Sequence, residues 1–282
     1  MPPIPRYFHS DDGLRLHVAD WLAPRADAPV LLCLPGLTRN GRDFARLAQR
    51  AQAAGWRVLC PDQRGRGLSE RDPDPRRYRP DRYVADMLTL LDQLGVAQVS
   101  IVGTSLGGMM GTMLAAMQPG RVQRLVLNDV GPVLEAQGLA RIAGYVGQQP
   151  PADSLDDAIA RTARTQATVF PDFDPADWCQ MVADTHRVED GQWWPDYDPA
   201  IAQGLANGSA TPPLWPLFDA ARDLPMLLLR GALSDLLSAD TVAAMRDRLP
   251  QLQAVEVPQR GHAPTLDEAQ ARAALDAFLL AP

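Results

Sequence analysis

Short apolar runs alternate with amphipathic segments along the first half of the chain. The apolar runs have the length and β-branched content of buried strands, and they cover residues 30–36, 56–62, 99–105 and 122–130. The segments between them repeat apolar residues at helical spacing and cover residues 42–55, 81–95 and 106–118. Strands that alternate with helices in this way are typical of crossover units, so we expect an α/β fold with a parallel sheet flanked by helices.

The alternation is interrupted once. Residues 132–222 form mainly helical segments with proline and glycine breaks, and no convincing buried strand. The alternation then resumes, with strands predicted at 225–231 and 252–258 and helices at 238–249 and 266–280. We therefore expect one α/β core of residues 1–131 and 223–282, interrupted by a helical insertion of residues 132–222. Two runs around "DDG" near the start predict an antiparallel hairpin that opens the sheet.

Charge is unevenly distributed along the chain. The formal net charge is −7, but residues 132–221 hold 13 acidic residues against 4 arginines, a net charge of −9 that leaves +2 for the rest. Nucleic acid and anionic membranes attract clustered positive charge, so we expect the protein to bind neither. The first residues show no signal-peptide pattern, and no run of about 18 apolar residues occurs, which favours a cytoplasmic, soluble protein. Monomer and homodimer both stay open.

The sequence offers little that would hold a metal or a cofactor. Its three cysteines lie far apart without Cys-x-x-Cys spacing, and its four histidines form no His-Glu-x-x-His motif. All 27 basic residues are arginine, so no lysine can bind phosphates, form a Schiff base or act as a general base. We expect neither a metal ion nor a cofactor.

Ser105 stands where the predicted strand 99–105 meets the next helix. Residues 103–107, "GTSLG", fit G-x-S-x-G, in which small residues flank a serine held in a strained turn. The helix that follows points its N-terminal N–H groups toward the same place, where they stabilise a developing anion. Glycine–serine turns after strands are common, but the position between a strand and a helix favours Ser105 as a nucleophile.

A serine nucleophile needs a base, and the base needs an acid that orients it. In a parallel sheet such groups gather beyond the carboxyl ends of the strands. His262 directly follows the last predicted strand, and Asp235 follows the strand before it. Since one helix joins these two strands, they should be neighbours, and we predict Asp235 as the acid. Asp129, which also follows a strand, stays an alternative.

We interpret two further candidates for catalytic residues, His17 and Asp62, as structural residues instead. His17 lies in the opening hairpin, away from the strand ends where catalytic groups gather. Asp62 ends a strand, but the sequence "PDQRGRGLS" around it favours a loop braced by carboxylate–arginine pairs.

A tetrahedral oxyanion needs two hydrogen-bond donors. The backbone N–H of Leu106 directly follows the nucleophile and is the first candidate. The backbone N–H of Leu37 is the second, because Gly36 allows a sharp turn after the strand 30–36 that would aim this N–H inward.

Six motifs together resemble the α/β-hydrolase fold superfamily over nearly the whole chain: "DDGLRLHV", "LPGLTRNGRDF", "DQRGRGLS", "GTSLGG", "RGALSD" and "GHAP". The resemblance implies an eight-stranded, mostly parallel sheet, with the insertion as a helical cap after the sixth strand. It also implies a Ser-His-Asp triad and an oxyanion hole. Many relatives place histidine before the oxyanion-loop glycine, where this chain has Pro35, so this loop is expected to be stiffer and to lack a polar side chain.

The nucleophile narrows the activities that the resemblance implies. Haloalkane dehalogenases and epoxide hydrolases of this fold use aspartate at the elbow, where this chain has Ser105. We predict a serine hydrolase of a small or medium carboxylic ester or lactone, with a C–C bond hydrolase of vinylogous diketones as the alternative on the same triad. A hydrolase fold kept as a non-catalytic ligand receptor is the alternative from another class. The acidic insertion favours an uncharged or cationic substrate with an apolar part.

Three side chains are candidates for the substrate pocket. Trp193 and Trp194 are adjacent in the proline-rich segment "QWWPDYDPA", which we expect to be a loop, so both rings cannot face one helix interior. Met109 follows the elbow. We predict that these residues line the pocket.

Overall fold

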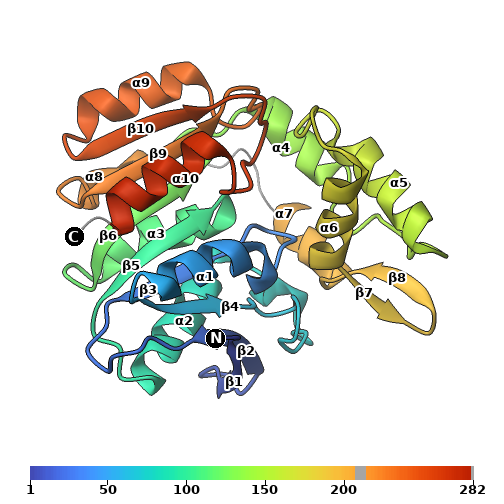
Figure 1. Ribbon diagram of the computed structural model, residues 1–282, viewed down its shortest axis with the longest axis horizontal. Helices are drawn as coiled ribbons and strands as arrows, with labels where there is room; N and C mark the ends of the chain where they lie inside the picture. Colours follow the sequence, from blue (N-terminus) through green and yellow to red (C-terminus); the bar gives the residue numbers. More distant parts are fainter. Residues whose placement is uncertain (207–213, 281–282) are drawn as a thin grey trace.

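In a computed structural model, the chain folds around one eight-stranded sheet, and the structure describes residues 1–206 and 214–280 (Figure 1). The strands are β1 (Ile4–His9), β2 (Arg15–Trp21), β3 (Val30–Leu34), β4 (Arg57–Pro61), β5 (Val99–Thr104), β6 (Val122–Asn128), β9 (Met226–Gly231) and β10 (Leu252–Val257). Their order is β1-β2-β4-β3-β5-β6-β9-β10. The pairs β1–β2 and β2–β4 are antiparallel and the others parallel. The predicted architecture and the opening hairpin are confirmed.

Helices cover both faces of this sheet. One face carries α1 (Ala45–Ala53) and α10 (Ala269–Leu275), which continues as a π-helical turn over Asp276–Leu280. The other carries α2 (Pro80–Gln93), α3 (Leu106–Met117), α8 (Trp215–Ala220) and α9 (Ala239–Arg248). Short 3-10 helices occupy Gly41–Phe44, Pro75–Arg77 and Pro199–Ile201. Within the described ranges, no helix combines the length and apolarity needed to cross a membrane.

The insertion forms a separate lobe between β6 and β9 (Figure 1). It contains α4 (Ala136–Ala143), α5 (Leu155–Gln166), α6 (Pro175–Thr185), β7 (His186–Glu189), β8 (Gln192–Pro195) and α7 (Ala202–Ala206). In Figure 1 the lobe lies on the side toward which the parallel strands run. One sequence expectation needs correction here. The segment expected to be a proline-rich loop begins as β8, which pairs antiparallel with β7. The insertion bounds of residues 132–222 stay a prediction. Near the end of that range, Phe218 of α8 is buried in the same cluster as the apolar residues of α3.

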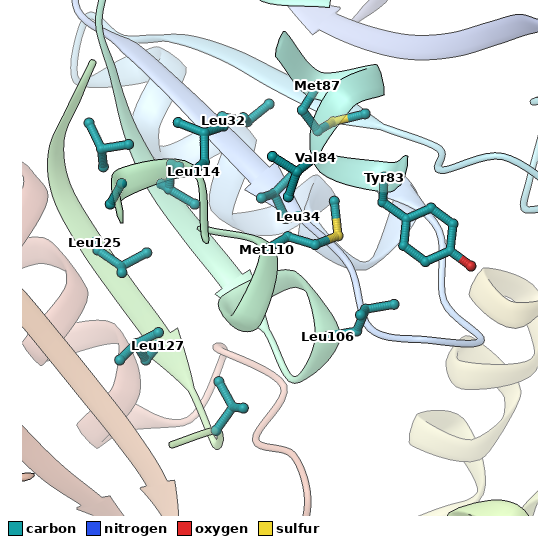
Figure 2. Packing of buried hydrophobic residues seen from close by; sticks show 14 of the residues in the cluster. Leu32, Leu34, Tyr83, Val84, Met87, Leu106, Met110, Leu114, Leu125 and Leu127 are labelled. Atoms are coloured by element: carbon teal, nitrogen blue, oxygen red, sulfur yellow. The ribbon is translucent and has the colours of Figure 1, made fainter. Parts of the chain in front are cut away.

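Helix α3 is anchored by apolar contacts on both of its sides. Figure 2 shows Met110 near Leu34 and Val84, Leu114 near Leu32, and Leu106 at the start of α3. The contacting side chains come from β3, β6 and α2: Leu32, Leu34, Leu125, Leu127, Val84 and Met87. Burial of one such side chain contributes about 1.5–3 kcal/mol to folding. The first turn of α3, which directly follows Ser105, is therefore held rigidly against the end of β3.

Candidate active site

Ser105 sits in a strained turn between β5 and α3. Its φ of +53° and ψ of −116° lie in a region that residues other than glycine rarely adopt. A Cβ at Gly107 would lie 1.9 Å from the carbonyl oxygen of Leu34, and one at Gly103 would lie 2.4 Å from the backbone of Gly107. Glycine at both positions therefore lets α3 approach the sheet closely enough to close the turn, as the motif predicts.

His262 meets the serine from the loop after β10. Its Nε2 lies 2.8 Å from the Ser105 Oγ, and the side chain is 7% exposed. The loop is fastened to the neighbouring strands by Asn128, whose Nδ2 donates to the Pro264 carbonyl at 2.8 Å and to the Thr104 hydroxyl at 3.1 Å. The sequence analysis did not single out Asn128, because an asparagine before a strand end gives no sign of a partner 136 residues away.

The carboxylate that faces His262 belongs to Asp129, so the prediction of Asp235 at this position is wrong on geometry. The Asp129 Oδ2 lies 2.8 Å from the His262 Nδ1. Strand β6 ends at Asn128, and Asp129 takes a φ of +56° that turns the chain. Its Oδ1 accepts a hydrogen bond from the Gly231 N–H at 2.8 Å. This fully buried carboxylate thus lies at the end of β6, the strand next to β5, which carries Ser105.

Asp235 has another partner. Both of its carboxylate oxygens accept hydrogen bonds from Arg141 on α4, at 2.6 and 2.9 Å. This bidentate pair lowers the pKa of Asp235 below its usual range, against the opposing effect of burial. The α4 backbone is held to the same turn, because the Gly138 N–H donates to the Asp235 carbonyl at 3.0 Å. Asp235 therefore ties the insertion to the core.

The two predicted oxyanion donors have free N–H groups. Neither the Leu37 N–H nor the Leu106 N–H donates a hydrogen bond to any group in the described part of the chain. The carbonyls on either side of the Gly36–Leu37 peptide are held by buried side chains. The Gln63 Nε2 donates to the Pro35 carbonyl at 3.1 Å, and the Arg66 Nε donates to the Leu37 carbonyl at 2.9 Å.

Gln63 and Arg66 were missed as residues of the site, although the sequence analysis interpreted their segment as a braced loop. That bracing is present: the Arg64 guanidinium is fully buried and pairs with Asp86 and Asp72. Asp62 accepts a hydrogen bond from the Gly41 N–H and lies 2.8 Å from the His17 Nδ1. The side-chain donors at Gln63, Arg64 and Arg66 indicate in the sequence that this loop forms many hydrogen bonds, but not which carbonyls accept them.

The predicted pocket residues do not share one hollow. Trp193 lines a hollow of about 290 Å³ in the insertion together with Tyr145 and His186. Burial raises the pKa of Tyr145 and lowers that of His186, so both side chains are uncharged near neutral pH. Trp194 lines a different hollow of about 290 Å³, because adjacent residues of β8 point to opposite faces. Neither hollow is lined by Ser105.

Met109 is half-buried in the first turn of α3, and its N–H donates to the Ser105 carbonyl at 3.1 Å. Its role in a pocket stays a prediction.

Three acidic groups close enough to share a metal ion come from the turn between β1 and β2 and from α2. Among the described residues they are Asp11, Asp12 and Asp86. Arg64 pairs with Asp12 and Asp86, and Arg82 pairs with Asp11 and Asp12. The cluster is therefore an ion-pair network that serves the loop bracing.

Comparison with known proteins extends this picture. A sequence model described as the alpha/beta hydrolase fold matches residues 29–269. The 3-hydroxybutyrate-oligomer hydrolase of Cupriavidus necator is 39% identical over 269 residues, which cover 91% of this chain and 90% of the relative. The 2-hydroxymuconate semialdehyde hydrolase of Pseudomonas sp. strain CF600 is 29% identical over 252 residues, covering 84% of this chain and 80% of the relative.

A solved structure agrees over almost the whole chain. The crystal structure of an alpha/beta hydrolase from Novosphingobium aromaticivorans superposes with a TM-score of 0.92 at 42% sequence identity. The match covers 99% of this chain and 98% of the other. The superposition therefore includes the insertion as well as the sheet.

Proposed function

This chain belongs to the alpha/beta hydrolase fold family, and we propose that it is a serine ester hydrolase of that family. One observation carries the proposal: the unbroken contact from the Ser105 Oγ to the His262 Nε2, and from the His262 Nδ1 to the Asp129 Oδ2, each step 2.8 Å long. This arrangement activates a hydroxyl for attack on an acyl carbon. The triad proposed is therefore Ser105, His262 and Asp129.

Acylation follows from these contacts. The His262 Nε2 takes the proton as the Ser105 Oγ attacks the ester carbonyl, and Asp129 stabilises the imidazolium that forms. The N–H groups of Leu37 and Leu106 are proposed to hold the oxyanion, since both are free to donate. His262 then returns the proton to the leaving alcohol. The products of this step are an acyl-serine ester and the free alcohol.

Deacylation uses the same groups with water in place of the serine. His262 removes a proton from a water molecule that attacks the acyl-serine carbonyl, and the same two N–H groups hold the second oxyanion. Collapse of that intermediate breaks the bond to Ser105, which regains its proton from His262. The carboxylic acid leaves, and the enzyme is restored.

We further propose that the substrate is a short ester of a hydroxy acid, with oligomers of 3-hydroxybutyrate as the first candidates. The support is the 39% identity to a 3-hydroxybutyrate-oligomer hydrolase over nine-tenths of both chains. A short linear oligoester of this kind carries one terminal carboxylate and is otherwise uncharged. The insertion, with a net charge of −9, does not favour this carboxylate, so the identity to the relative carries the substrate proposal and the charge does not.

Labelling with a fluorophosphonate probe tests the triad proposal. The wild-type protein should be labelled and should hydrolyse 3-hydroxybutyrate dimers and trimers. Ser105→Ala should lose labelling and about 10⁴-fold or more in kcat/KM. Ser238→Ala is the matched control, because this serine caps α9 and its hydroxyl contacts Thr241. A folded wild-type protein that is neither labelled nor active on any ester would overturn the proposal and favour a ligand receptor.

A C–C bond hydrolase is the second candidate, favoured by the 29% identity to 2-hydroxymuconate semialdehyde hydrolase. Such an enzyme would add water across the bond next to a ketone of a vinylogous diketone. Both substrate classes should therefore be assayed with the same preparation. A kcat/KM for the diketone that exceeds those for the oligoesters by tenfold or more would move the assignment to this candidate.

A further inference from the structure

The carboxylate of Asp129 has a third hydrogen-bond donor besides His262 and the Gly231 N–H. The Ser234 hydroxyl donates to the Asp129 Oδ2 at 2.6 Å, and this is the same oxygen that faces the His262 Nδ1 at 2.8 Å. Asp129 is fully buried, so solvent does not compete for its oxygens. Ser234 and His262 therefore share the negative charge of one oxygen atom.

The Ser234 hydroxyl is oriented by its own neighbours. Its Oγ accepts hydrogen bonds from the Leu237 N–H at 3.0 Å and from the Leu236 N–H at 3.3 Å. A hydroxyl has one proton to donate and two lone pairs to accept with. Because both lone pairs face N–H donors, the proton points to Asp129. The turn of residues 234–237 thus holds one donor on the acid.

We propose that Ser234 is a positioning residue that sets the strength of the contact between Asp129 and His262. A hydroxyl that donates to a carboxylate disperses its charge and fixes its orientation. Removal of this donor leaves more negative charge on the Oδ2 that faces His262, so the protonated imidazole is held more strongly. The base then stays protonated, and inactive as a base, up to a higher pH. The inference rests on the triad proposed above.

The other charged groups near Ser234 and Asp129 already form ion pairs with one another. Asp235 and Arg141 neutralise each other, and Arg260 pairs with Glu268 and Asp172. None of these pairs involves Ser234, so its replacement by alanine changes no ion pair directly. The hydrogen bond to Asp129 is the contact through which Ser234 reaches the triad.

The turn of residues 234–237 also has a structural role, and the experiment must separate this role from the effect of Ser234 on Asp129. The Glu135 N–H donates to the Leu236 carbonyl at 2.9 Å, so the turn helps to hold the insertion. Loss of the Ser234 hydroxyl could loosen this contact without any effect on the acid. A loosened turn lowers activity or stability, but it does not alter the pH at which the base titrates.

The test compares Ser234→Ala, Ser234→Thr and Ser238→Ala with the wild type. Ser234→Thr keeps the hydroxyl, and Ser238→Ala removes a nearby hydroxyl that does not touch Asp129. In Ser234→Ala, kcat/KM on an ester that the wild type hydrolyses should fall about tenfold. The acidic limb of its pH profile should move up by about half a pH unit. Ser234→Thr should restore both values, and Ser238→Ala should move neither.

The proton NMR signal of the His262 Nδ1–H gives a second, independent measure, and it should change in Ser234→Ala alone. An acidic limb that stays in place in Ser234→Ala would overturn the inference, and so would failure of Ser234→Thr to restore it. Failure of the proposed function is distinct, because the wild-type protein would then show no probe labelling and no pH profile to compare.

Discussion

Two buried histidine–aspartate pairs of equal length occupy different places in this molecule. The His262 Nδ1 lies 2.8 Å from Asp129, and the His17 Nδ1 lies 2.8 Å from Asp62. The pairs differ in what the other ring nitrogen meets. The His262 Nε2 faces the Ser105 hydroxyl, whereas the His17 Nε2 makes no hydrogen bond within the described ranges.

The two pairs therefore differ in their surroundings and not in their own geometry. The carboxylate of Asp62 also accepts hydrogen bonds from the Gly41 and Leu68 N–H groups, so it holds three parts of the chain together. Only the pair that adjoins the strained serine at the carboxyl edge of the sheet has a group to activate. The continuous contact from Ser105 through His262 to Asp129 therefore identifies the candidate site, and a histidine–aspartate pair alone does not.

The largest difference between the two pairs is expected when each aspartate is replaced by asparagine. Asp129→Asn should lower kcat/KM by about 10³- to 10⁴-fold, because the amide favours the wrong imidazole tautomer and cannot stabilise the imidazolium. Asp62→Asn should keep kcat/KM per folded molecule within about threefold and lower only the free energy of unfolding. Ester hydrolysis with active-site titration and urea unfolding measure both effects. Equal activity losses in the two variants would contradict the distinction.

Replacement of the structural histidine should have a smaller effect, and on stability alone. His17→Gln removes a buried hydrogen bond to a charged group, so the free energy of unfolding should fall by about 1–3 kcal/mol. Probe labelling of Ser105 should be unchanged in the folded protein. Denaturant midpoints and labelling rates measured on one preparation check both statements. A slowed labelling rate in fully folded His17→Gln would show that the second pair acts on the site.

The smallest loss of stability is expected on replacement of Asp235, whose carboxylate pairs with Arg141 and not with His262. Its pKa is lowered in the folded state by Arg141, so the ion pair stabilises the fold above the unfolded-state pKa of about 3.9 and is lost as the pH falls through the folded value. Asp235→Asn should therefore cost about 1 kcal/mol at pH 7 and progressively less below about pH 4.

Urea unfolding at several pH values measures this dependence. Activity of Asp235→Asn should stay within about tenfold of the wild type, since both carboxylate oxygens of Asp235 bind Arg141 and not a group of the proposed triad. A larger loss of activity in Asp235→Asn than in Asp129→Asn would instead make Asp235 the acid in the working enzyme.

The choice of Asp235 over Asp129 as the acid shows which feature of the site the sequence could not predict. Both follow strands that end at the same edge, and Asp235 was favoured because a single helix joins its strand to the strand before His262. Asp235 lies four residues beyond the end of β9, and Arg141 on α4 holds it. Asp129 follows β6 directly, and its positive φ brings its carboxylate to the Gly231 N–H. Neither the turn nor the distant arginine leaves a periodic signal in the sequence.

The loop that carries Leu37, one of the two proposed oxyanion donors, gives a second example. Leu37 and Leu106 could be named from the motif, because a donor next to the nucleophile and one after β3 follow from local chain order. That Gln63 and Arg66 hold the carbonyls around the Leu37 N–H could not be predicted. The contact depends on a loop after another strand, and only the order of strands in the folded sheet brings the two loops together.

The sequence by itself determined the alternation of strands and helices, the strained turn at Ser105 and the histidine that meets it. These features depend on local sterics, on side-chain periodicity and on the shared edge of a parallel sheet. The tertiary structure decided which carboxylate faces His262, which side chains hold the carbonyls around Leu37, and that Trp193 and Trp194 line separate hollows. These depend on contacts between segments far apart in the chain, whose geometry exists only when the whole fold has closed.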